Sequence, residues 1–325
     1  MRILHISTRL ILGGSQENTV LSCEGQARRG HDVHLAFGPI YGPEGSLLDR
    51  VQKFRATPPA APFGADAESR GITTHEVPHL IREISPLADL RCYGELRRLI
   101  RTLKPDVVHT HSSKAGIVGR AAAWAGRGRV VLDPQSIEYA GRARRTYRPA
   151  GGMAIVHTIH GPPFHANLPW HTNRLYIPAE RFAARRCHAI IGVCNEMVRQ
   201  FVAHDIGAPN QYHTVYSGME VEPFLTPEVG ETRDDVRRRL GLSHDDFVIG
   251  TVARLAEHKG HDDILDALAD DLREHPEWKL LWVGDGWWRE RLVARAREMG
   301  IGVRALAASN GARNVSKGAR TDEQG

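Results

Sequence analysis

RILHIS, at residues 2–7, is a short apolar run that is typical of a buried strand. It is followed by GGSQENTVLSCEGQARRG (13–30), which combines a glycine turn with a helical pattern, and by DVHLAF (32–37), a second apolar run. A strand, a helix and a strand in this order are typical of a parallel sheet with helices on its faces. These three segments therefore predict an α/β fold.

The same alternation continues along the first part of the chain. We expect further strands over 74–80, 106–111, 154–161 and 188–194, and helices over 88–103, 114–126 and 179–187. Residues 38–70 are rich in Pro, Gly and Ala and predict an irregular surface loop. Alternation this regular predicts a doubly wound parallel sheet in a Rossmann-like domain over residues 1–219, which closes with YHTVYSG (212–218).

A second, shorter series of the same kind follows a polar, acidic linker at residues 221–232. FVIGTV (247–252) and WKLLWVGDG (278–286) predict two strands, each followed by a helical segment. The pattern then stops, so residues 220–304 predict a truncated second Rossmann-like domain and residues 305–325 a disordered tail. A sheet cut in this way would leave exposed edges and apolar surface, which predicts marginal stability or association of the second domain.

Two cations mark the loop after the first strand of this second domain. In VARLAEHKG (252–260), Arg254 directly follows the strand and Lys259 precedes an amphipathic helix. A helix N-terminus offers unpaired backbone N–H groups and the positive end of a dipole. A forked guanidinium and an ammonium at this place suit a diphosphate, although the pair alone also fits an ordinary solvated loop.

Glycines stand in two strand-to-helix turns, which is where a doubly wound fold binds phosphate. Gly13 and Gly14 precede the first helix, and Gly284 follows the strand that ends in WVGDG. The first turn lacks the GxGxxG pattern of a dinucleotide site, and no acidic residue follows it at the expected distance. These glycines predict a backbone that approaches a substrate closely or, equally, a tight turn alone.

Histidines end two strands of the first domain. DVVHTH ends with His109 and His111, and AIVHTIHG carries His157 and His160. Strand alternation points His157 away from His160, whereas His111 and His160 both lie at the carboxyl edge of the sheet, where ligands bind. We predict that these two serve a hydroxyl-bearing substrate. A zinc site formed by these histidines is an alternative, but the sequence shows neither an HxxxH pattern on a helix nor a carboxylate partner that would support it.

Composition bounds the class of protein and its partners. The chain has 325 residues, enough for two ordinary domains, and its 41% apolar and 25% charged residues are typical of a soluble globular protein. The net charge of +5 and the pI near 9.2 favour anionic partners. Its basic runs predict solvated helix faces or, as an alternative, peripheral contact with an anionic membrane. They lie at residues 95–104, 141–148 and 181–186.

Cysteine usage and hydropathy indicate the compartment. The four cysteines show neither a CxxC pair nor metal-ligand spacing, which is typical of reduced thiols in a cytosolic protein. The N-terminus runs into a strand without a signal peptide, and no apolar run approaches the ~20 residues that span a bilayer. We therefore expect a cytoplasmic protein. If the basic runs bind lipid, it would act at the inner face of the membrane.

Five motifs together resemble those of a family 4 glycosyltransferase of GT-B fold, the retaining kind that uses nucleotide sugars. They are, in chain order, GGSQE, DVVHTHSSKAGIVGR, IVHTIHGPPFH, VARLAEHKG and VGDG. The resemblance covers residues 1–300, and VARLAEHKG together with HTIHG is its most specific part. It implies two facing Rossmann-like domains, with the donor bound mainly to the second and the acceptor to the first.

The resemblance also implies roles for single residues. Arg254 and Lys259 would clamp the diphosphate, and Gly14 would donate to it from the backbone of the opposite domain. His160 would lie near the reacting sugar and His111 nearer the acceptor. The resemblance implies neither a metal nor a cofactor, because the two cations neutralise the departing diphosphate.

The sequence departs from the family pattern in two places. The E-x7-E motif of the family should lie well beyond VGDG, whereas Glu290 and Glu298 match the spacing on the helix directly after it. The same spacing recurs by chance at Glu68 and Glu76, so we reject Glu290 and Glu298 as the motif. The second departure is LDPQSIEYAGRARRTYRPAGGM (132–153), which predicts an inserted basic loop.

We predict an enzyme that transfers a glycosyl group, with retention, from a nucleoside diphosphate sugar to a hydroxyl of a glycan or lipid-linked acceptor. The resemblance suggests cell-surface polysaccharide or glycolipid biosynthesis and no nucleic-acid partner. The missing carboxylates predict impaired activity of this chain and favour one alternative, a non-catalytic glycosyltransferase-like binding protein. The absence of GxGxxG and of Tyr-x-x-x-Lys argues against another, a nucleotide-binding oxidoreductase or epimerase.

Overall fold

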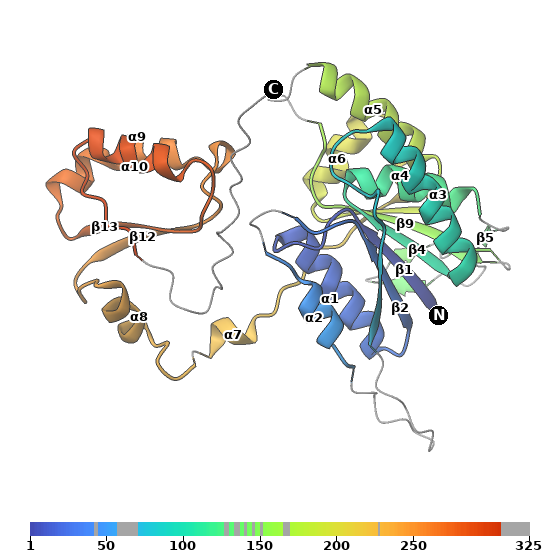
Figure 1. The fold of residues 1–325 in the computed structure, drawn as a ribbon, viewed down its shortest axis with the longest axis horizontal. Coiled ribbons are helices and arrows are strands. Elements are labelled where there is room, and N and C mark those ends of the chain that lie inside the picture. The colour runs from blue at the N-terminus through green and yellow to red at the C-terminus, as the bar shows by residue number, and fades with distance from the viewer. Residues whose placement is uncertain are drawn as a thin grey trace, which may run out of the picture. The chain divides into compact units, whose positions relative to one another are not determined.

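A computed structural model gives the fold of the chain (Figure 1). The residues whose structure it describes are 1–41, 45–56, 71–126, 130–132, 137–139, 142–144, 147–149, 152–164, 170–226 and 228–306. They divide into two compact units, Met1–Met219 and Glu220–Gly325, which we describe separately. No helix in these ranges is both long enough and apolar enough to cross a bilayer.

The first unit is built around a seven-stranded parallel sheet with the strand order β11-β10-β9-β4-β1-β2-β3 (Figure 1). The order runs outward in both directions from β1 and β4, which are the central pair, so the sheet is doubly wound and the predicted α/β fold is confirmed. Its strands are β1 (Arg2–Ser7), β2 (Asp32–Phe37), β3 (Ile72–Glu76), β4 (Val107–His111), β9 (Ala154–Ile159), β10 (Ala189–Gly192) and β11 (Tyr212–Thr214).

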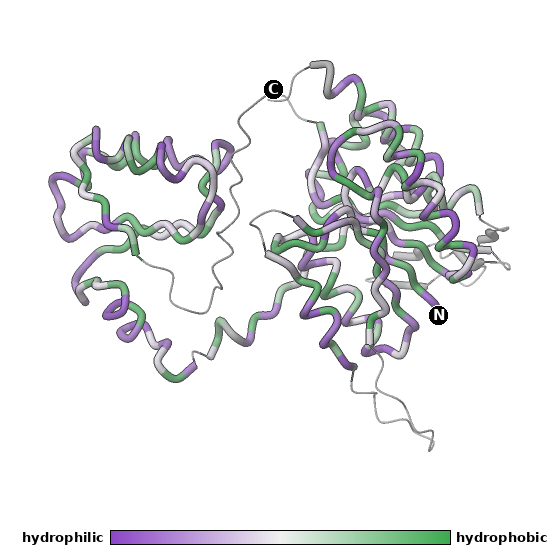
Figure 2. The backbone as a smooth tube through the Cα atoms, in the orientation of Figure 1, coloured by the Kyte–Doolittle hydropathy of each residue, from purple (hydrophilic) through white to green (hydrophobic). Residues whose placement is uncertain are grey.

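Helices cover both faces of this sheet because its strands are apolar on both faces. On one face, Val33 and Leu35 of β2 are buried with Val20 of α1. On the other, Leu4 of β1 and Val108 of β4 are buried in the core that includes residues of α3 and α4. In Figure 2 the strands are accordingly largely hydrophobic, and hydrophilic stretches recur along the outer helices. The helices are α1 (Gly14–Arg28), α2 (Leu48–Lys53), α3 (Pro86–Leu103), α4 (Ser113–Trp124), α5 (Trp170–Ala184) and α6 (Asn195–Ala203).

Several segments of the first unit differ from the sequence-based expectation. Helix α5 runs from Trp170 to Ala184, whereas we expected a helix over 179–187. Helix α2 lies inside residues 38–70, where we expected irregular loop; Val51 at its centre is fully buried, and this burial stabilises the short helix. Strand β3 ends at Glu76, four residues before the predicted end. The expected basic loop at 132–153 contains short antiparallel pairs. They are formed by β5 (Val130–Leu132) with β8 (Tyr147–Pro149) and by β6 (Ile137–Tyr139) with β7 (Arg142–Arg144).

The second unit has a two-stranded parallel sheet in its described residues, β12 (Phe247–Val252) beside β13 (Trp278–Val283). Helices α9 (His261–Glu274) and α10 (Arg289–Glu298) lie over one face of these strands (Figure 1) and bury a small core around Leu265 and Leu292. Both strands keep partly exposed side chains throughout, so the second sheet is partial, as predicted. Helices α7 (Glu222–Leu225) and α8 (Arg233–Leu240) precede it, and the predicted tail at 305–325 lies outside the described residues from 307 on.

A buried ion pair joins two helices of the first unit. The Arg120 guanidinium of α4 donates to the Glu180 carboxylate of α5 over 2.6 Å, and both side chains are 1% exposed. Arg120 also donates through Nε to the carbonyl of Gly116 at 2.8 Å. Because both charges are removed from water, each depends on the other for compensation.

We predict that Glu180→Leu lowers the free energy of unfolding of the first unit by about 3–5 kcal/mol, since it leaves the Arg120 charge buried without a partner. The double variant Arg120→Met/Glu180→Leu should recover most of this loss, because it removes both charges. Urea unfolding, followed through backbone NMR signals of the first unit, measures both effects. A single variant as stable as the wild type would contradict the assignment.

Candidate functional site

Strand register gathers five polar side chains on one face of the first sheet. His5 of β1 lies opposite His109 of β4, and His111 of β4 lies opposite Thr158 of β9. Side chains two residues apart along a strand share a face, which adds His160 just beyond β9. The two predicted histidines, His111 and His160, are therefore brought together at the carboxyl edge of the sheet.

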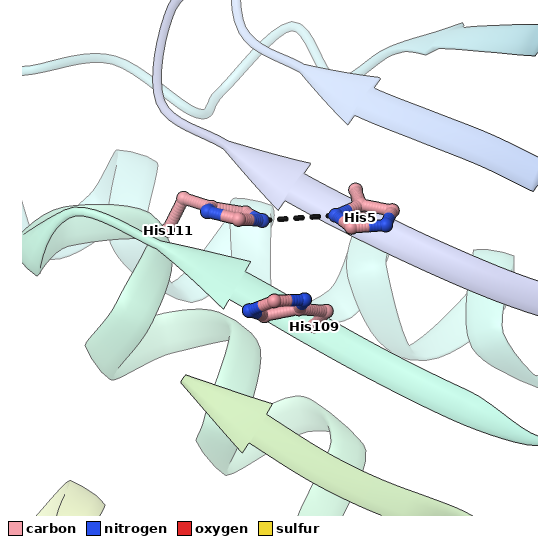
Figure 3. Close-up of side chains that lie close together, drawn as sticks. All are labelled: His5, His109 and His111. Carbon is pink, nitrogen blue, oxygen red and sulfur yellow. Dashed lines mark hydrogen bonds between the residues drawn. The ribbon is translucent and has the colours of Figure 1, made fainter. Parts of the chain in front are cut away.

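Hydrogen bonds connect three of these imidazoles in a line. His111 Nδ1 lies 3.1 Å from His160 Nε2. On the other side of the ring, His111 Nε2 lies 2.9 Å from His5 Nδ1, the contact that is dashed in Figure 3. The line continues into α1, where Oε1 of Gln26 lies 2.7 Å from His5 Nε2. His109 stacks on His111 with ring centroids 4.3 Å apart and bonds through Nε2 to Thr158 Oγ1 at 2.7 Å.

The histidines of this line are uncharged at neutral pH. Burial lowers the pKa of His5 from 6.5 to about 4, against the opposing effect of its hydrogen bond to Gln26. Burial likewise lowers the pKa of His160 to about 4. The pKa values of His109 and His111 fall well below 6.5, first through burial and then through repulsion from neighbouring imidazoles. The site is therefore polar and neutral, which suits hydroxyl groups better than it suits anions.

His157 lies on the opposite face, as strand alternation predicted. Its Nδ1 is 3.0 Å from Thr110 Oγ1 and 3.2 Å from the carbonyl oxygen of Thr110, and the side chain is 2% exposed. Burial and then the neighbouring charge of Arg120 hold the pKa of His157 well below its usual value. We interpret His157 as a packed core residue.

Among the described residues, His5, His109 and His111 form a group whose ring nitrogens could hold a metal ion, all within 4.8 Å of one another. Two of those nitrogens, His5 Nδ1 and His111 Nε2, already form a hydrogen bond with each other. The Nε2 atom of His109 is likewise engaged, by Thr158 Oγ1 at 2.7 Å. The geometry favours a hydrogen-bonded cluster over a metal centre.

The turn before α1 leaves room at the same edge of the sheet. Gly13 and Gly14 are exposed where α1 begins, and no side chain caps the helix. A Cβ atom added at Gly14 would meet nothing within 4 Å. The first backbone N–H groups of α1 have no partner within the helix, and helix N-termini of this kind can bind phosphate.

In the second unit, the two predicted cations lie in the loop between β12 and α9. Arg254 is half-buried, with Cζ 5.7 Å from the ring centroid of Trp287. Lys259 ends the short 3-10 helix η2 (Glu257–Lys259); it is exposed, and its ammonium forms no ion pair with any described residue. The loop thus presents both charges at the N-terminal side of α9.

A second loop packs against this one through the backbone. Ala253 N donates to the carbonyl of Val283 at 3.1 Å, and Leu255 N donates to the carbonyl of Asp285 at 3.0 Å. A Cβ atom at Gly284 would lie 2.0 Å from the Ala253 carbonyl oxygen. The absence of a side chain at Gly284 is therefore required by the loop that carries Arg254, whether or not a substrate also touches this glycine.

Sequence reasoning missed His5 and Gln26. The alternation in RILHIS places His5 on one face of β1, and β1 neighbours β4 in a doubly wound sheet, so a register argument could have found it. Gln26 offers no such signal, because its contact with His5 depends on how α1 rotates over the sheet. Glu290 and Glu298, which we rejected as a carboxylate motif, are exposed on α10.

Comparison with known protein families matches both units. Residues 13–218 match the family model "Glycosyl transferase 4-like domain", and residues 232–311 match "Glycosyl transferases group 1". The first match alone spans more than half of the chain and includes the glycine turn and all the histidines of the site except His5. The second includes the Arg254 loop and the Gly284 turn.

Individual proteins give the same result. The chain is 30% identical over 184 residues to the UDP-Gal:alpha-D-GlcNAc-diphosphoundecaprenol alpha-1,3-galactosyltransferase of Escherichia coli, covering 56% of this chain and 41% of that protein. It is also 30% identical over 165 residues to D-inositol 3-phosphate glycosyltransferase 1 of Catenulispora acidiphila, covering 50% and 34%. The chain therefore spans less than half the length of both relatives.

Solved structures share the fold. Sucrose-phosphate synthase from Thermosynechococcus elongatus superposes with a TM-score of 0.62 at 15% identity, over 93% of this chain and 68% of that one. A glycosyltransferase from Rickettsia africae gives a TM-score of 0.57 at 17% identity, over 92% and 64%. At such identities the likeness concerns the fold.

We predict that the first unit loses stability as the pH falls from 6.5 towards 4. In this range the unfolded chain binds protons at histidines that the folded unit keeps neutral, so the proton stabilises the unfolded state. For His5, a pKa lowered from 6.5 to about 4 corresponds to roughly 3 kcal/mol. Urea unfolding at several pH values measures the loss, and stability that stays constant down to pH 4 would show that the cluster is not buried and neutral.

We also predict that Gly284→Ala lowers the stability of the second unit by more than ~1 kcal/mol, because the new methyl group must push the Ala253 carbonyl away. Gly302→Ala is the matched control, since a Cβ atom there meets nothing within 4 Å. Thermal unfolding of the two variants, side by side, compares them. Equal stability would mean that the two loops do not pack as described.

Proposed function

Because its residues 13–218 match the Glycosyl transferase 4-like domain, the chain belongs to this glycosyltransferase family, and we propose that it transfers a sugar from a nucleoside diphosphate donor to a hydroxyl acceptor with retention. The single observation that carries the proposal is the loop with Arg254 and Lys259 before α9. It combines a guanidinium, an ammonium and a helix N-terminus in one short segment, which is a combination suited to a diphosphate leaving group.

In the proposed reaction, the bond between the anomeric carbon and the diphosphate oxygen breaks while the acceptor hydroxyl attacks from the same face. Negative charge grows on the departing diphosphate, and Arg254 and Lys259 stabilise it there. The proton of the acceptor hydroxyl passes to a phosphate oxygen. Since these two cations neutralise the leaving group, the proposed mechanism requires no divalent metal and no cofactor.

We assign the neutral histidine cluster of the first unit to hydroxyl-bearing ligands. His160 and His111 are uncharged and hydrogen-bonded to each other, so the ring nitrogen of His160 that His111 does not engage can bond a hydroxyl without the cost of moving a charge. The open N-terminus of α1 at Gly13 and Gly14 supplies backbone donors of the kind that bind phosphate oxygens.

We propose a lipid-linked or glycan hydroxyl as the acceptor, in cell-surface polysaccharide or glycolipid biosynthesis. Support comes from the two relatives described above, whose names give a diphosphoundecaprenol-linked sugar and an inositol phosphate as acceptors. The net charge of +5 favours anionic acceptors of this kind and would also favour work at the inner face of an anionic membrane.

A second candidate is a binding protein without transfer activity. It is favoured by the second unit, whose described residues form only two strands and place Glu290 and Glu298 on an exposed helix face. Calorimetry with UDP- and GDP-sugars separates the candidates, because a binding protein that has lost the donor site should give no heat with any of them.

We predict that Arg254→Ala and Lys259→Ala each lower transfer by about 10²–10³-fold, since a group that stabilises transition-state charge typically contributes about 2.7–4 kcal/mol. The control is Arg238→Ala, which removes an exposed arginine from α8. Single-turnover assays of sugar release compare the three variants with the wild type. Undiminished transfer in both loop variants would refute the proposed role.

A further inference from the structure

We propose that Gln26, His5 and His111 form a directional hydrogen-bond relay that holds His160 in one tautomer, with its hydrogen on Nε2 and none on Nδ1. The tautomer follows from the first unit alone, whereas its use in binding a sugar hydroxyl rests on the proposed function. In these terms Gln26, His5 and His111 are positioning residues for His160.

The direction of the relay is set at its inner end. Gln26 presents its carbonyl oxygen to His5 Nε2 at 2.7 Å, and an oxygen can only accept, so the hydrogen of neutral His5 lies on Nε2. His5 Nδ1 then carries no hydrogen and must accept from His111 Nε2 at 2.9 Å. By the same rule His111 Nδ1 accepts from His160 Nε2 at 3.1 Å. One amide oxygen thus determines where three rings carry their hydrogens.

The relay keeps this direction because its rings stay neutral. His5 is 0% exposed and His111 is 1% exposed, so a second proton on either ring would be a charge removed from water. A doubly protonated His111 would also point a hydrogen at a neighbouring nitrogen that already carries one. His109 stands outside the line, because its Nε2 bonds Thr158, and its ring supports His111 by stacking.

The consequence appears at the outer end of the relay. His160 is the half-buried member, at the carboxyl edge of the sheet. With its hydrogen on Nε2 engaged by His111, its Nδ1 can only accept a hydrogen bond. A ligand hydroxyl at His160 must then act as the donor, which leaves the oxygen of that hydroxyl richer in electrons. The relay therefore favours hydroxyl-bearing ligands over ligand groups that can only accept.

The test changes Gln26, which lies on α1 at the far end of the relay from His160. In protein with ¹⁵N-labelled histidine near neutral pH, the nitrogen shifts of each ring report which atom carries the hydrogen, and His160→Gln identifies the His160 signals. We expect the Nε2–H tautomer in the wild type. Gln26→Glu offers only acceptors and should retain it. Gln26→Lys offers only donors, so the hydrogens of all three rings should move and His160 should carry its hydrogen on Nδ1.

Two results would overturn the relay. One is a wild-type His160 with its hydrogen on Nδ1, which needs no variant. The other is an unchanged His160 tautomer in Gln26→Lys while the backbone NMR spectrum and thermal unfolding remain those of the wild type. The test also separates the two proposals. If the wild type transfers sugar while His160 carries its hydrogen on Nδ1, the relay alone is rejected. If Gln26→Lys moves the His160 hydrogen to Nδ1 but the wild type transfers no sugar, the proposed function alone is rejected.

Discussion

The site in the first unit depends on two parallel strand pairings of β4, with β1 on one side and with β9 on the other. The register places His5 against His109 and His111 against Thr158, so these four side chains share one face. A slip of one residue in either pairing would move a whole strand's side chains to the opposite face. The apolar residues that alternate with the histidines prevent this slip, because Leu4 and Val108 are fully buried in the core on the other side. The hydrophobic core thus sets the geometry of the polar site.

Buried imidazoles impose a second constraint, which is that each of them must find a partner. A buried polar group without a hydrogen bond lowers the free energy of unfolding by about 1–3 kcal/mol. The line from Gln26 to His160 meets this requirement for His5 and His111 at both ring nitrogens. A network of this kind is sensitive at every member, because the loss of one partner leaves its neighbour unsatisfied. A change at Gln26 on α1 would therefore affect His160 at the other end of the line, through His5 and His111.

Sequence patterns were sufficient for the sheet, and for His111 and His160, because strand alternation and the carboxyl edge of a parallel sheet are periodic, local properties. They also placed His157 on the opposite face correctly. They failed where packing decides: α2 forms in a Pro- and Gly-rich region because Val51 becomes buried. The contact of Gln26 with His5 depends on the rotation of α1 about its axis, which no period in the sequence encodes. In the second unit, the types of Arg254 and Lys259 and their place after a strand predict a diphosphate site, and this role stays a prediction.

The candidate sites of the two units differ in charge: the first is neutral and the second is cationic. The first unit uses burial to keep its imidazoles neutral, which fits hydroxyl groups. The second keeps permanent charges, Arg254 and Lys259, on a loop shaped by backbone pairing with the Gly284 turn. Neutral acceptors would do little for a departing diphosphate, and fixed cations would not distinguish one sugar hydroxyl from another. The transfer that we propose, of a sugar from a diphosphate donor, would draw on both kinds of group.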